Sequence, residues 1–65
     1  MPLWRAEDGS PIACREKIKV LDENFAELRQ VAVDALDDGV LLGCSEMQLR
    51  QAMLDLIATL ACSLS

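Results

Sequence analysis

The segment CREKIKVLDENFAELRQVAVDALDDGVLL, residues 14–42, is the most informative part of this 65-residue chain. Small or apolar residues recur along it in alternating steps of four and three, at Cys14, Ile18, Leu21, Phe25, Leu28, Ala32, Ala35, Gly39 and Leu42. We call this set the apolar stripe. Its spacing is a seven-residue repeat with apolar a and d positions, typical of a long helix packed against other helices. The sequence therefore predicts an all-α protein.

The boundaries of the long helix follow from capping residues. Ser10 fits an N-cap with Pro11 at the first helical position, so residues 1–9 are expected to form an irregular arm and residues 10–65 a single domain. The helix could end at Asp38 with Gly39 as its C′ residue, or run to about Leu42 with Gly43 as C′. We favour the longer helix, because the shorter one would end on acidic residues at the negative end of its dipole.

A second helix is predicted from about residue 45 to residue 64. Ser45 and Gln48 form an S-x-x-Q capping box, in which the Ser45 hydroxyl accepts the Gln48 N–H and the Gln48 side chain reaches back to the Ser45 N–H. The connection between the helices is so short that they must form an antiparallel hairpin. At 1.5 Å per residue the helices span roughly 48 Å and 28 Å, so residues 11–23 are expected to lack a partner in their own chain.

The predicted second helix is apolar on two sides, and one neighbouring helix cannot cover both. A second subunit would cover this surface and the unpartnered start of the first helix, so we expect a homodimeric four-helix bundle. Hydrophobic residues make up 52% of the chain, which also favours association. The residues expected to pack in the hairpin and dimer are Cys14, Ile18, Leu21, Phe25, Leu28, Ala32, Ala35, Leu49, Met53, Leu56, Ile57 and Leu60.

Leu3 and Trp4 stand out in the N-terminal arm. They could anchor a protein partner, because a Trp is a frequent binding hot spot. Alternatively the arm folds back, and the two side chains cover the start of the long helix. We favour the second interpretation, because that part of the helix needs covering.

The residue types argue against catalysis. The chain has neither His nor Tyr, and its carboxylate pairs fall on outer positions of the repeat. We therefore expect no enzymatic activity, no catalytic residue, no cofactor and no metal site. The three cysteines, Cys14, Cys44 and Cys62, form no CxxC pair. Cys14 and Cys62 are interpreted as small core residues, and Cys44 either packs on Leu49 or acts as a redox-sensing thiol before a helix N-terminus.

The charge and the apolar runs limit the classes of partner. The net charge is −5, which is opposite to that of a general nucleic-acid binder. No apolar run reaches membrane-spanning length and the N-terminus lacks a signal-peptide pattern, so we expect a cytoplasmic protein with reduced thiols and no membrane partner.

Residues 42–45, followed by Leu49 and Arg50, resemble the turn and second helix of helix-turn-helix DNA-binding domains. The resemblance covers about fifteen residues and implies a DNA-binding regulator as an alternative function, although nucleic acid is not the expected partner. A thiol-based redox sensor is a further alternative. The leading hypothesis is a small non-enzymatic protein–protein interaction module, an adaptor, regulator or small subunit, whose partner is a second copy and, in addition, an unidentified protein.

Overall fold

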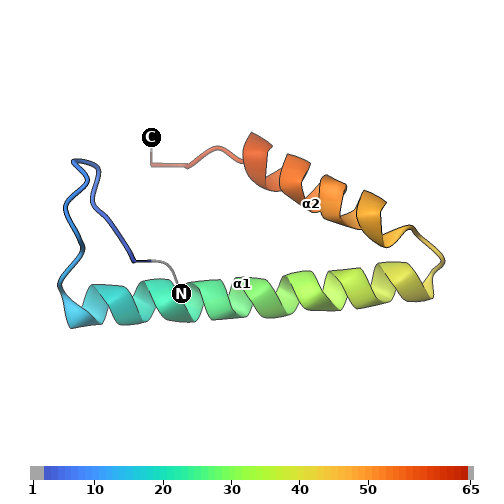
Figure 1. Ribbon diagram of the computed structural model, residues 1–65, viewed down its shortest axis with the longest axis horizontal. Coiled ribbons are helices and arrows are strands. Elements are labelled where there is room, and N and C mark those ends of the chain that lie inside the picture. Colours follow the sequence, from blue (N-terminus) through green and yellow to red (C-terminus); the bar gives the residue numbers. More distant parts are fainter. Residues whose placement is uncertain (1–2, 65) are drawn as a thin grey trace. The chain divides into compact units, whose positions relative to one another are not determined.

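The computed structural model describes residues 3–64 and contains two helices, α1 (Arg15–Leu41) and α2 (Glu46–Thr59), shown in Figure 1. No strand occurs within the described residues, so the predicted all-α class is confirmed. The chain divides into two compact units, one up to Gln30 and one from Val31, which we describe separately. Neither helix has the length and apolar character that a membrane span requires in the described part of the chain.

In the first unit, α1 begins at Arg15, so the prediction that Ser10 caps a helix starting at Pro11 is wrong. The Ser10 hydroxyl instead donates to Oδ1 of Asp8 at 2.6 Å, and Pro11 forms an isolated antiparallel bridge with Arg5. A local side-chain bond of this kind competes with helix capping. The turn is completed by Gly9, which has a φ of 89°. The irregular arm therefore extends to residue 14.

In the second unit, α1 passes through Gly39 and ends with Gly43 as its C′ residue, as the sequence favoured. The φ of Gly43 is 92°. Its N–H donates to the Val40 carbonyl at 3.0 Å, and the Cys44 N–H donates to the Gly39 carbonyl at 2.9 Å. These two bonds form a Schellman motif, which satisfies carbonyls left open at the end of the helix.

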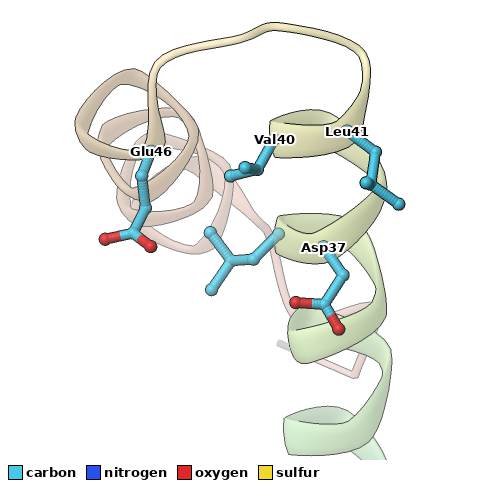
Figure 2. A pocket seen from close by; sticks show the side chains of 5 residues that line it. Asp37, Val40, Leu41 and Glu46 are labelled. Atoms are coloured by element: carbon cyan, nitrogen blue, oxygen red, sulfur yellow. The ribbon is translucent and has the colours of Figure 1, made fainter.

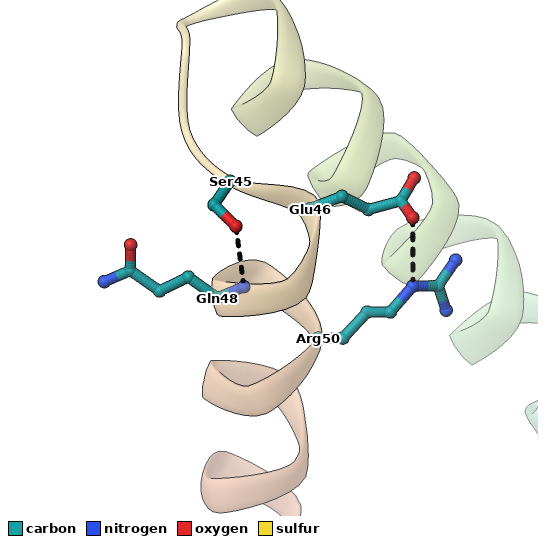
Figure 3. Close-up of polar contacts among 4 residues, drawn as sticks. All are labelled: Ser45, Glu46, Gln48 and Arg50. Atoms are coloured by element: carbon teal, nitrogen blue, oxygen red, sulfur yellow. Dashed lines mark hydrogen bonds and ion pairs between the residues drawn. The ribbon is translucent and has the colours of Figure 1, made fainter.

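Helix α2 begins directly after Ser45, its N-cap residue (Figure 3). The Ser45 hydroxyl accepts the Gln48 N–H at 3.3 Å. The side chain of Gln48 extends away from the Ser45 backbone, and its oxygen accepts the Cys44 thiol at 3.8 Å. The first half of the predicted capping box is therefore present, while the Gln48 side chain bonds elsewhere. An ion pair of 3.5 Å between Glu46 and Arg50 spans the first turn.

Helix α2 ends at Thr59, five residues before the predicted end at Leu64. The Thr59 hydroxyl donates to the carbonyls of Asp55 at 2.9 Å and Leu56 at 3.1 Å, and Leu60 is extended. Residues 60–64 contain no glycine that could form a left-handed cap. The side chain of Leu64 is 94% exposed, so no tertiary contact holds a further helical turn.

Within the second unit, α2 lies against the C-terminal part of α1 and forms the two-helix hairpin (Figure 1). Gly39 permits their close approach, because a Cβ atom there would lie 2.6 Å from both terminal methyl carbons of Leu49. Leu36 is half-buried, whereas Ala35 of the predicted stripe is exposed. Residues spaced seven apart on a straight helix shift by about 20° around its axis with each repeat. Over the several repeats of the stripe, this shift moves the covered face of α1 away from position 35 and towards position 36.

Candidate protein interface

The most informative property of the surface is that no side chain among the described residues is fully buried. Five of the residues predicted to pack are half-buried, namely Ile18, Leu21, Ala32, Leu49 and Met53. The other seven are exposed, namely Cys14, Phe25, Leu28, Ala35, Leu56, Ile57 and Leu60. Small domains normally bury roughly 60% of the surface of the unfolded chain around one core. The expected packing residues are therefore only partly covered by their own chain.

The arm covers one part of the apolar stripe in the first unit. The Trp4 Nε1–H donates to Oδ1 of Asp22 at 2.8 Å, and its ring lies 4.9 Å from that of Phe25 with a tilt of 54° between the planes. Tilted aromatic pairs at this distance are stabilising. Trp4 therefore folds back on α1, as the sequence favoured, whereas Leu3 remains 67% exposed.

Contacts within each unit cover only parts of the stripe. Phe25 contacts Trp4 and is still 47% exposed, and Gly39 approaches Leu49. Leu28 is 46% exposed and Leu42 is 87% exposed, while Leu21 is half-buried. Sequence periodicity placed all of them on one face and could not tell how much of each side chain its own chain covers.

Helix α2 also presents apolar side chains to solvent. Leu54 is 64% exposed and Ile57 is 54% exposed, and the two line a shallow, almost entirely apolar hollow with Arg50 and Met53. Met47 in the first turn of the helix is 81% exposed. This side of α2 is the second apolar face that the sequence predicted to need a partner.

A second hollow lies in the hairpin (Figure 2). Leu36, Val40 and Leu41 give it an apolar surface, and the carboxylates of Asp37 and Glu46 flank it from the two helices. No set of three metal-ligating side chains occurs within residues 3–64. The Glu46 carboxylate also pairs with Arg50. The hollow thus combines apolar contact area with negative charge.

The three thiols are not disulfide-bonded, and Cys14 and Cys62, which were interpreted as small core residues, are exposed in the single chain. Cys14 is instead the residue before α1. The backbone N–H groups of Lys17, chiefly, and of Glu16 donate to its sulfur and lower the pKa of the thiol below its usual 9.0. Sequence reasoning missed this N-cap because it placed the start of the helix at Pro11. Cys44, the predicted sensor, is half-buried.

Cys14 is expected to react with iodoacetamide at a lower pH than an ordinary cysteine, because its thiolate is stabilised in the folded state. The rate of alkylation is measured as a function of pH in a variant that carries both Cys44→Ser and Cys62→Ser. The pH at the midpoint of this curve should lie below 9.0, and it should rise when the chain is unfolded in denaturant. The thiolate contributes to stability above pH 9.0, and this contribution is lost as pH falls through the folded-state pKa. Equal midpoints in the folded and unfolded chain would contradict the capping role.

Comparisons of the chain with protein-family models, with curated proteins and with solved structures find no match.

Proposed function

We propose that the protein is a small non-enzymatic interaction module that acts as a helical homodimer. The observation that supports this proposal is the exposure of large apolar side chains on both helices. No side chain within residues 3–64 is fully buried, and Val31 of α1 is 65% exposed while Leu54 of α2 is 64% exposed. A self-contained domain buries many of its large apolar side chains in a core.

A permanent dimer covers apolar surface of this kind. Obligate homodimers bury about 1,000–2,500 Å² per subunit, and their interfaces are more apolar than those of transient complexes. The apolar side chains that would enter such an interface are already exposed on both helices, and they include Leu28 and Val31 of α1 and Leu54 and Ile57 of α2. A second copy would supply the missing core, in a bundle of four helices.

The proposed role is that of an adaptor, a regulator or a small subunit of a larger assembly. Leu3 is proposed as the anchor for a further protein because it is 67% exposed, whereas the neighbouring Trp4 contacts Phe25 and Asp22. The net charge of −5 favours a partner with a basic surface. No catalytic group is assigned, and the proposal places the protein in the cytoplasm.

Sedimentation equilibrium of the full chain tests the proposal. We expect a dimeric mass at micromolar concentration, and we expect helicity measured by circular dichroism to fall on dilution, since folding and association are coupled. A folded, concentration-independent monomer would refute it.

A further inference from the structure

We infer that the end of the hairpin in the second unit binds a basic amphipathic segment of a partner protein, one that carries Lys or Arg beside large apolar side chains. This inference rests on the proposed interaction module and names the site for its further partner. The site, which we call the tip patch, lies where α1 ends and α2 begins. Its residues are Asp37, Asp38, Val40, Leu41, Leu42 and Glu46.

The tip patch presents two adjoining apolar hollows to solvent. Leu36 and Val40 line the hollow between the two helices (Figure 2), and Leu42 lines the hollow beside it. Leu41 lines both hollows, so they form one surface. Leu41 is 84% exposed and Leu42 is 87% exposed, more than any other large apolar side chain among residues 3–60. This exposure distinguishes the tip patch from the rest of the hairpin.

Two carboxylates of the tip patch lie where their charge is unfavourable. Asp37 and Asp38 are at the C-terminal end of α1, whose last turn carries no basic residue. Open carbonyl groups give this end of a helix a partial negative charge, which cations stabilise and carboxylates do not. Neither carboxylate forms an ion pair within residues 3–64. A cation supplied by a partner would relieve the repulsion.

The third carboxylate of the tip patch is already compensated. Glu46 lies in the first turn of α2, at the positive end of that helix, and pairs with Arg50 at 3.5 Å. Arg50 is the only Lys or Arg of the sequence from residue 31 onward. We therefore assign recognition of the partner's cations to Asp37 and Asp38.

Charge separates a basic protein segment from the other occupants of such a surface. The second unit has five carboxylates against one cation, and the first unit has six against five. Neither unit of a second copy is net positive, so another copy of the chain offers no charge complement. Nucleic acid and an anionic membrane surface are repelled for the same reason. Lys or Arg beside apolar side chains complements both the carboxylates and the hollows.

Fluorescence anisotropy of the full chain with a labelled synthetic peptide tests the charged part of the site. The probe is an amphipathic peptide of Leu and Lys, and a counterpart with Glu in place of Lys should bind at least about tenfold more weakly. The double variant Asp37→Asn, Asp38→Asn should weaken binding of the Lys peptide about tenfold, equivalent to about 1.4 kcal/mol.

Asp55→Asn is the matched control for the loss of charge. It removes a carboxylate of the same unit, and Asn keeps the oxygen that accepts the Gln51 amide. Asp55 lies about 14 Å along α2 from Glu46, which is beyond the screening length at physiological salt. Binding of the Lys peptide should therefore stay within about threefold of wild type. An equal loss in this control would show that net charge, and not the tip patch, attracts the peptide.

Two further measurements separate recognition from a structural role. Leu41→Ser with Leu42→Ser should also weaken binding about tenfold and leave the helicity unchanged, because both side chains are exposed. The double variant Asp37→Asn, Asp38→Asn should melt at a higher temperature than wild type although it binds less well, since the carboxylates oppose the helix dipole. Weaker binding together with a lower melting temperature would overturn the assignment.

Sedimentation equilibrium of the same proteins separates this inference from the proposed homodimer. A dimer that binds the Lys peptide through the tip patch supports both. A dimer that does not bind the peptide overturns the inference alone, and a monomer that binds it through the tip patch overturns the homodimer alone.

Two other outcomes identify a different occupant, and either overturns the inference. If Leu41→Ser with Leu42→Ser converts a dimer into a monomer, a second copy covers the tip patch. If the wild-type chain binds phosphatidylcholine vesicles through these leucines and does not bind the Lys peptide, the occupant is a lipid surface.

Discussion

Leu28→Asp is expected to raise the dimer dissociation constant by at least about a hundredfold. Leu28 is 46% exposed in the single chain and is one of the residues proposed to enter the dimer interface, so the substitution acts twice in each dimer. Each copy loses apolar burial and places a carboxylate where the second copy would desolvate it. A hundredfold change corresponds to about 2.7 kcal/mol, and sedimentation equilibrium measures it directly.

Ala26→Asp is the matched control for this variant. Ala26 is exposed and lies on the side of α1 opposite Leu28, so the added charge should leave the dimer within about threefold of wild type. If Leu28→Asp retained the wild-type dissociation constant, Leu28 would not lie in the interface. If both variants were monomeric, the added negative charge itself, rather than its position, would be the cause.

Phe25→Asp is expected to release the arm and to lower the stability of the first unit by about 2–3 kcal/mol. It removes the aromatic pair with Trp4 and the part of the ring surface that this contact covers. It also places a second carboxylate one turn from Asp22, the acceptor of the Trp4 Nε1–H. Small domains seldom have more than about 3–5 kcal/mol of stability, so helicity and the dimer should both be lost.

Trp4 is the single tryptophan of the chain, and its fluorescence reports this change. We expect the emission of Phe25→Asp to shift to longer wavelength as the ring enters water, together with reduced far-ultraviolet circular dichroism. Ala26→Asp should keep the wild-type spectrum. Unchanged helicity and mass in Phe25→Asp would contradict the role given to the Trp4–Phe25 contact.

Local signals predicted the elements well where a single residue type decides the geometry. Gly43 ends α1 because its positive φ strains other residues, and Ser45 begins α2 because its hydroxyl accepts a backbone N–H. Predictions failed where two local arrangements compete. Ser10 could cap a helix or close a turn with Asp8, and the second arrangement is the one found. Thr59 ends α2 although the apolar pattern continues beyond it.

Periodicity and capping chemistry within a few residues already indicate that the chain is helical, that a long helix carries an apolar stripe, and that Gly43 marks its end. How much of each stripe residue the chain covers depends instead on contacts between residues far apart in the sequence, which a local pattern does not encode. In the first unit Trp4 contacts Phe25, and in the second unit Leu49 lies at Gly39. Leu28 remains 46% exposed, and we propose that the second copy covers it.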